Sequence, residues 1–305
     1  MSASLFRNRV LLLPLVAVLA LVAGVGARAQ SAVDKSIFVS VVDASGKPVK
    51  DLTAAEFQIR EDNMMREVVG VKPATQPLAI QLLMDTSENA GGSTGMAAGV
   101  DIVRDIRTSL IGFSRHVTTS SPDSQIAIME FGQAAIQVAN YTSKFEDLEK
   151  AINRLFPKPK AASVLHEALI EASKSLGRQK TPRRAIVVLN VEPGEEQSRE
   201  QPNDILKAIQ ASGASLWVVH IQKSEGRNSA RDLVLGRLTQ ITGGRRESIV
   251  GQSAIEGYLK AYADALMNQY EITYKRPESR TPAQQTLVGI TRAGLRLHAN
   301  AFAPK

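Results

Sequence analysis

The chain has 305 residues, of which 44% are hydrophobic, and this composition predicts a globular protein with a substantial core rather than a disordered one. It contains no cysteine, which excludes a disulfide framework, cysteine-ligated zinc and thiol catalysis. The formal net charge of +7 falls to about +4 when the three arginines of the first 29 residues are set aside, so we expect no nucleic-acid partner.

The first 29 residues have the three parts of a secretory signal peptide. Arg7 and Arg9 precede an apolar stretch over residues 10–25, and alanines occupy positions 27 and 29. The apolar stretch is shorter than the ~20 residues that a membrane-spanning helix needs. We therefore expect cleavage after Ala29, a secreted or periplasmic location and no membrane span after cleavage. An uncleaved anchor is the alternative.

Residues 30–76 have short β-like patterns. Apolar and polar residues alternate over 37–42 and 57–61, and a further short strand is expected at 67–71. Two or three strands enclose too little apolar surface to be stable alone. This segment is therefore expected to pair with strands from elsewhere in the chain.

Residues 77–269 alternate between strand-like and helix-like patterns. This alternation predicts an α/β fold, a Rossmann-like and mostly parallel central sheet with helices on both faces. The predicted strands are 78–85, 125–131, 134–138, 185–190, 215–221 and 248–250. The predicted helices are 96–116, 145–156, 163–176, 205–211, 230–242 and 254–267.

The link between the second and third of these strands consists of Gly132 and Gln133 alone. A link of two residues permits only a hairpin, so one of the two strands must run antiparallel to the others. We expect that strand at the edge of the sheet.

Residues 270–305 alternate at period two and have no helical pattern, with strands expected over 270–275, 287–292 and 295–301. The economical assembly pairs these strands with residues 30–76 in one small β-sandwich. The α/β domain, residues 77–269, would then be an insertion whose two ends lie close together.

The strand at 78–85 is apolar until it ends in Asp85, which is followed by Ser87 and Asn89 at alternate positions. Open α/β sheets bind their ligands at the carboxyl ends of the strands. Oxygen-bearing side chains are the ligands that hard divalent cations prefer. This stretch therefore points to a fold and to a metal site at once.

The order of these segments resembles the von Willebrand factor type A domain. The likeness rests on the Asp85-x-Ser87-x-Asn89 loop, the amphipathic helix after it, the hairpin and the helix start at 162–169. The flanks, residues 39–62 and 270–274, are similar to those of exported bacterial proteins that carry a related domain. The resemblance implies a metal-ion-dependent adhesion site at the top of the sheet and a protein-binding role without catalysis.

The sequence departs from the ligand set that this resemblance implies. Asn89 replaces a serine, Ser163 replaces a threonine, and Val191 lies where an aspartate is expected. Glu192, one residue further on, could supply the missing carboxylate if the turn is rebuilt. We therefore predict a degenerate site for which no cofactor is established and whose candidate cation is Mg²⁺, or else Mn²⁺ or Ca²⁺. Its candidate ligands are Asp85, Ser87, Asn89, Ser163 and Glu192.

The predicted function is binding of another protein through the loops at this edge, with metal optional. The residues predicted to contact the partner are Asp85, Ser87, Glu88, Asn89, Ser163 and His166. One alternative is an adhesin that depends on Mg²⁺. Another is a cryptic serine hydrolase built from Ser87 or Ser163 with His166 and Asp85, although the chain has no Gly-x-Ser-x-Gly elbow and we expect no enzyme.

Two further predictions concern residues away from this site. The basic clusters at 178–184 and 243–246 fall at predicted turns, where solvated charge is expected. Trp217 and His220 lie within an apolar strand and are expected in the core.

Overall fold

The computed structural model describes residues 32–91, 102–192, 194–222, 229–250, 254–278 and 281–304. The predicted signal peptide, its cleavage after Ala29 and the first residues of the helix predicted at 96–116 lie outside the described residues. Within the described residues, no helix is both long and apolar enough to cross a membrane.

A six-stranded sheet forms the centre of the α/β unit, with the strand order β10-β9-β8-β5-β6-β7. The strands are β5 (Leu78–Met84), β6 (Gln125–Phe131), β7 (Ala135–Thr142), β8 (Arg183–Glu192), β9 (Ser215–Gln222) and β10 (Arg246–Val250). All neighbouring strands are parallel except β6 and β7. The predicted hairpin is therefore confirmed, with β7 as the antiparallel strand at the edge.

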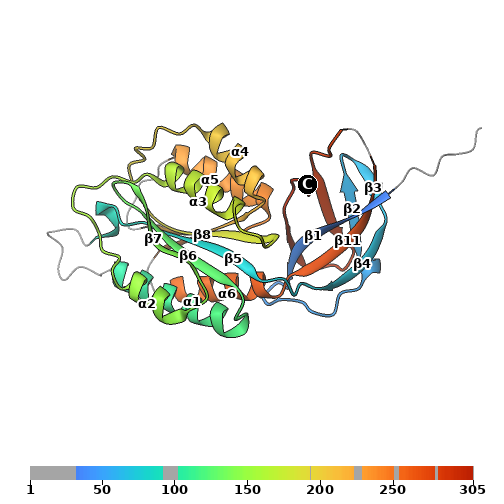
Figure 1. Ribbon diagram of the computed structural model, residues 1–305, viewed down its shortest axis with the longest axis horizontal. Helices are drawn as coiled ribbons and strands as arrows, with labels where there is room; N and C mark the ends of the chain where they lie inside the picture. Colours follow the sequence, from blue (N-terminus) through green and yellow to red (C-terminus); the bar gives the residue numbers. More distant parts are fainter. Residues whose placement is uncertain are drawn as a thin grey trace, which may run out of the picture.

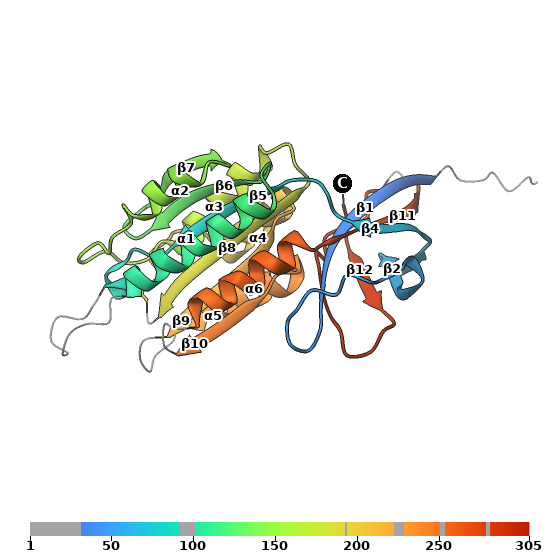
Figure 2. The same ribbon diagram turned by 90° about the horizontal axis from the view of Figure 1, so that it is seen from below.

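Helices cover both faces of this sheet (Figure 1). One face carries α1 (Ile102–Ser120), α2 (Phe145–Ile152) and α6 (Ile255–Met267), and Figure 2 shows α1 and α6 side by side across it. The other face carries α3 (Leu165–Gly177), α4 (Pro202–Ser212) and α5 (Ser229–Thr242). Because both faces are covered, every residue of β5 is buried and the strand is apolar almost throughout. The predicted α/β fold class is confirmed.

Strands from the two ends of the chain form two antiparallel sheets, ordered β13-β1-β11-β4 and β12-β2-β3. They enclose a separate apolar cluster that includes Val39, Ile59 and Ile272. The strands are β1 (Ala32–Val42), β2 (Phe57–Glu61), β3 (Met64–Arg66), β4 (Val68–Pro73), β11 (Tyr270–Pro277), β12 (Thr286–Ile290) and β13 (Arg296–Ala299). We call these two sheets, with the short 3₁₀ helix η1 (Ala54–Glu56), the β unit. A second 3₁₀ helix, η2 (Glu88–Ala90), follows β5 in the α/β unit.

The α/β unit follows β4 and precedes β11, and these two strands pair with each other. Pro73 lies opposite Tyr270, and the Ala74 N–H donates to the Gln269 carbonyl at 2.8 Å. The chain therefore leaves the β unit and returns to it at one place (Figure 1). The domain boundaries at residues 76 and 269 stay predictions.

Arg183, at the start of β8, binds both of these crossing segments. Its guanidinium donates to the carbonyls of Ala74, Gln76 and Leu266 and to Oε1 of Gln269. The residue is only 4% exposed. The prediction of solvated charge for its basic cluster is wrong at this position, because the two crossing segments surround the side chain with four acceptors and exclude solvent.

Candidate functional site

The carboxyl ends of β5 and β8 bring a polar cluster together beneath the surface. Asp85 follows β5, Asn190 and Glu192 end β8, and Ser163 precedes α3. All four residues are 0% exposed. Because β5 and β8 are parallel neighbours, their ends meet at the same edge, and the Asp85 N–H donates to the Leu189 carbonyl at 3.0 Å. We call this group, together with Arg231 and Glu196, the edge cluster.

The Asp85 carboxylate connects the two strand ends through main-chain groups. Its Oδ1 accepts from the Ser87 N–H at 2.9 Å, and its Oδ2 accepts from the Val191 N–H at 3.1 Å. Burial raises the pKa of Asp85, although its contacts with Ser87, the Val191 N–H and the charge of Arg231 act to lower the pKa. Both carboxylate oxygens therefore already hold the loop after β5 against the end of β8.

Two hydroxyls of the loops at this edge lie in the interior. Thr86 Oγ1 and Ser163 Oγ are buried and have no hydrogen-bond partner among the described residues. Gly132 approaches Thr86 so closely that a Cβ at position 132 would lie 2.9 Å from its Oγ1. Ser87 is also 0% exposed. The two serines predicted as ligands, Ser87 and Ser163, thus both lie below the surface.

Arg231, near the start of α5, brings a positive charge into the edge cluster and is 0% exposed. Its Nη1 donates to Asn190 Oδ1 at 3.1 Å and to Glu192 Oε1 at 3.2 Å. Its Nε donates to Glu196 Oε2 at 3.1 Å. The sequence analysis missed this residue, since a single arginine in a polar helix start has no motif that marks it as buried.

A divalent cation at this edge would need carboxylates that are free to coordinate it. The position of the expected aspartate is Val191, whose side chain packs into the apolar cluster of the α1 face. Glu192 faces Arg231 with Oε1 and accepts from the Gly194 N–H with Oε2 at 2.9 Å. Within the described ranges, no group of three or more acidic or histidine side chains could hold a metal. The carboxylates present therefore do not fit the requirement of Mg²⁺ for charged oxygen ligands.

The residues predicted to contact a partner divide into buried and exposed ones. Asp85, Ser87 and Ser163 are 0% exposed, and His166 is 7% exposed. Glu88 is exposed and Asn89 is partly exposed, both in η2. If this edge binds a partner, direct contact falls to Glu88 and Asn89, while the buried residues hold the loops. The roles of all six stay predictions.

The geometry offers no support for the hydrolase alternative. Ser163 Oγ and His166 Nε2 are both buried and neither has a hydrogen-bond partner among the described residues, so they do not bond to each other. Asp85 binds main-chain N–H groups rather than a histidine. Burial lowers the pKa of His166, against the raising effect of the Glu196 charge. Ser163, His166 and Asp85 therefore form no hydrogen-bonded series of nucleophile, base and acid.

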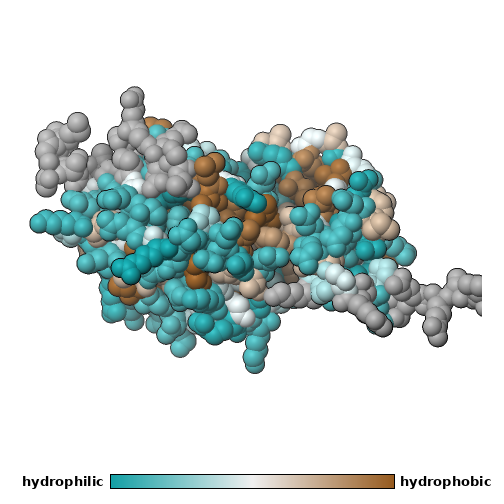
Figure 3. Space-filling model, turned by 90° about the horizontal axis from the view of Figure 1, so that it is seen from above, coloured by the Kyte–Doolittle hydropathy of each residue, from teal (hydrophilic) through white to brown (hydrophobic). Residues whose placement is uncertain are grey.

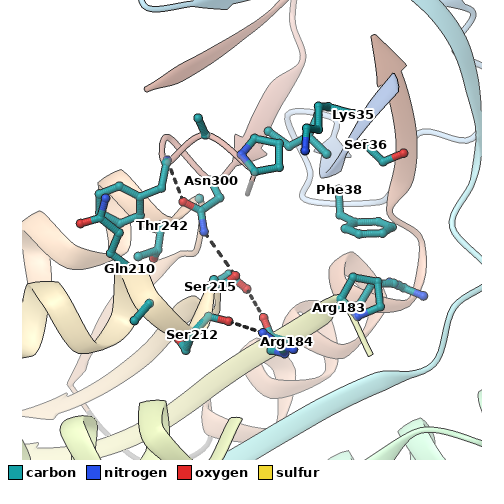
Figure 4. A pocket seen from close by; sticks show the side chains of 18 of the residues that line it. Lys35, Ser36, Phe38, Arg183, Arg184, Gln210, Ser212, Ser215, Thr242 and Asn300 are labelled. Carbon is teal, nitrogen blue, oxygen red and sulfur yellow. Dashed lines mark hydrogen bonds between the residues drawn. The ribbon is translucent and has the colours of Figure 1, made fainter. Parts of the chain in front are cut away.

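A cavity of about 710 Å³ lies at the opposite end of the sheet, between the two units. Figure 4 shows Lys35 and Phe38 of β1 on one side of it and Arg183 and Arg184 of β8 on the other. Arg184 Nη1 donates to the Ser212 carbonyl at 2.8 Å, which ties β8 to α4. Figure 3 shows a mostly hydrophilic surface in which apolar side chains gather near the junction of the two units.

His298, in β13, lies against the α/β unit at this junction. Its Nδ1 donates to the Gly244 carbonyl at 3.2 Å, and its ring lies 6.1 Å from that of Trp217. Trp217 itself is 0% exposed, as predicted. Burial, with help from nearby arginines, lowers the pKa of His298 to about 4. His298 is therefore neutral at pH 7, because its buried surroundings and the nearby arginines disfavour the charged ring.

We expect His298 to make the protein sensitive to acid. Between its ordinary pKa of 6.5 and about 4, the unfolded chain takes up a proton that the folded chain refuses, so the free energy of unfolding falls as the pH falls. Between pH 7 and pH 4, the free energy of unfolding of His298→Asn should fall by on the order of 1–3 kcal/mol less than that of the wild type. Urea unfolding followed by Trp217 fluorescence measures this, and an unchanged pH dependence in the variant would contradict it. Burial shifts the pKa of His166 and His220 in the same direction, so part of the dependence remains.

No protein-family model and no curated protein matches the sequence. Solved structures do match. Proximal thread matrix protein 1 from the mussel byssus is 15% identical with a TM-score of 0.51, and the match covers 64% of this chain and 50% of that one. The SpRpn10 VWA domain is 12% identical with a TM-score of 0.46, covering 62% of this chain and 97% of the other.

A third similar structure is the vWF domain of the type V pili tip protein Mfa5 from Porphyromonas gingivalis. It is 10% identical with a TM-score of 0.48, and the match covers 62% of this chain and 95% of that one. At such identities a structural match speaks for the fold alone. The α/β unit has a von Willebrand factor A-like fold, and the predicted resemblance is confirmed at the level of the fold. The chain spans half the length of the mussel protein.

Proposed function

We propose that this is an exported, non-enzymatic protein that binds a partner protein through the loops at the carboxyl edge of the α/β sheet, without requiring metal. The observation that carries the proposal is the Asp85 carboxylate, which holds the loop after β5 to the end of β8 through two main-chain N–H groups. Loops fixed in this way lose little conformational entropy when a partner binds. A similar structure is named as a matrix protein, which accords with a role in assembly.

The exposed side chains on these loops suit a protein partner. Phe156 is 56% exposed, and the Arg107 guanidinium lies 4.7 Å from the centre of its ring. The segment that contains Phe156 packs beside η2, because the Glu88 N–H donates to the Ala161 carbonyl at 2.8 Å. Exposed aromatic and arginine side chains are the residues most often central to protein interfaces. The exposed or partly exposed residues of these loops include Glu88, Asn89, Phe156 and Lys160.

The test is capture from an envelope extract, with and without a chelator. We expect the chain to retain a partner in both conditions and Phe156→Ala to reduce the retained amount at least about tenfold, as for a central interface aromatic. Glu88→Ala should reduce it less. The matched control is Leu287→Ala, because Leu287 is 53% exposed but belongs to the β unit.

Two outcomes would count against the proposal. Retention that Leu287→Ala abolishes and Phe156→Ala leaves intact would move the binding surface to the β unit. Retention that the chelator abolishes would favour the adhesin that depends on Mg²⁺, the second candidate function.

A further inference from the structure

We propose that the guanidinium of Arg231 supplies the positive charge that a divalent cation supplies in metal-ion-dependent adhesion sites. The loops of this edge would then be held in place by a cation that is part of the chain itself. The inference stands independently of the proposed function, since its test needs no partner.

The first argument is the set of carboxylates around Arg231. Its Nη1 lies 3.2 Å from Glu192 Oε1, and its Nη2 lies 3.0 Å from Glu196 Oε2. The side chains of Arg231 and Glu192 are 0% exposed and that of Glu196 is 9% exposed. Buried ions are tolerated only when they are paired with good geometry and further hydrogen bonds. One guanidinium thus pairs with two carboxylates, one at the end of β8 and one four residues further along the chain, and it ties both of them to α5.

The second argument is that the acidic groups of the edge cluster are already occupied. Glu192 accepts from Arg231 and Asn190 Nδ2 with Oε1 and from the Gly194 N–H with Oε2. Asp85 accepts one main-chain N–H with each oxygen. A divalent cation would have to displace these donors, and Mg²⁺ itself sheds its water reluctantly.

Third, two neighbouring positions, 191 and 192, differ together from the ligand set of a metal-ion-dependent adhesion site. The chain has Val191 where an aspartate is expected. The Val191 side chain packs in the core, and its N–H donates to Asp85 Oδ2. The carboxylate appears one residue later, at Glu192, where it faces Arg231. A loss of negative charge at the metal position and a gain of internal positive charge are the two changes that a metal-independent site needs.

The fourth argument is the space made for the guanidinium. A Cβ at Gly194 would lie 2.8 Å from Nη1 of Arg231 and 3.1 Å from the Val191 carbonyl. The chain therefore passes Arg231 at a distance that only glycine permits without movement. The segment after β8 is built around this side chain.

The experiment compares metal response and stability in four proteins: wild type, Arg231→Met, Arg231→Lys and the double variant Arg231→Met with Val191→Asp. Each is melted with MgCl₂ or MnCl₂ at about 5 mM and with a chelator, since a ligand that binds only the folded state raises the melting temperature. For the wild type we expect shifts below about 1 °C in all conditions. Arg231→Met should melt roughly 5–10 °C lower, and Arg231→Lys should fall between the two.

The double variant provides the gain-of-function arm. With the arginine charge removed and a carboxylate restored, we expect Mn²⁺ to raise its melting temperature by several degrees, and a further Asp85→Ala change to abolish the rise. A wild type that Mn²⁺ or Mg²⁺ stabilises in a manner dependent on Asp85 would overturn the proposal. So would an Arg231→Met variant as stable as the wild type.

Two milder changes serve if Arg231→Met does not fold. Glu192→Gln keeps the shape of the side chain and removes its charge, and Gly194→Ala presses on Nη1 while it leaves every charge in place. Both should lower the melting temperature without creating a response to metal. Stability equal to that of the wild type in both variants would contradict the role of the guanidinium.

Discussion

Arg183→Met is expected to lower the free energy of unfolding by about 3–5 kcal/mol, because it leaves two buried and two partly buried acceptors without their donor. The guanidinium binds both segments that cross between the units, at Ala74 and Gln76 on one and at Leu266 and Gln269 on the other. Burial lowers the pKa of Arg183 to about 10, but the group stays charged at neutral pH. Methionine keeps the apolar length of the side chain, so the loss reports the polar contacts.

The measurement is urea unfolding, followed by the fluorescence of Trp217, which is the only tryptophan of the chain and lies in β9. Hydrogen exchange at the Ala74 N–H should also become faster, since its bond to Gln269 belongs to the same junction. The control is Arg178→Met, from the same basic cluster but exposed, with an expected change within about 0.5 kcal/mol. Equal losses in the two variants would show that Arg183 does not hold the junction.

In the β unit, Glu61→Ala is expected to lower the free energy of unfolding by a similar amount, about 3–5 kcal/mol. Glu61 is 0% exposed and accepts from Tyr274 Oη at 2.7 Å, from Arg276 Nε at 2.8 Å and from Arg66 Nε at 3.3 Å. These partners lie on β3 and β11, so one carboxylate joins the first and last parts of the chain. Its removal leaves two arginines without their shared counter-ion, which is the costly way to break a buried pair.

The pH dependence gives this prediction a second readout. Burial raises the pKa of Glu61, but Arg276, Tyr274 and Arg66 together bring it below the ordinary value of 4.5. The stabilisation is therefore present above pH 4.5 and is lost as the pH falls through the lowered pKa. Glu61→Ala should flatten the unfolding profile below pH 4.5, whereas the exposed Glu67→Ala control should not. If the profile of Glu61→Ala is as steep as that of the wild type, Glu61 is not the source of the pH dependence.

Much of the fold could be predicted because it is recorded in local patterns. The hairpin follows from Gly132 and Gln133, since two residues cannot form any other connection. The buried strand β5 follows from an apolar run that needs cover on both faces. The short helix η2, after the polar end of that run, was not predicted. The location of Asp85 at a strand end was therefore predictable. Its burial was not, since burial depends on the loops that fold over it.

The polar contacts could not be predicted from the same patterns. Arg231 and Glu192 are separated by 39 positions and lie on different elements. Arg183 meets acceptors more than 80 positions away on one side and more than 100 on the other. A long charged side chain looks the same in sequence whether it faces water or a buried carbonyl. Arg183 was therefore predicted to be solvated, and Arg231 was given no role.

The strand that ends at Asp85, the alternation of elements and the degenerate ligand positions were determined by the sequence alone, because period and spacing encode local structure and the order of the strands. Which charge balances the edge cluster was decided only by the tertiary structure. The packing of α5 against β9, the neighbour of β8 in the sheet, places Arg231 beside Glu192 and Glu196. Such a contact follows from how distant segments pack rather than from any spacing along the chain.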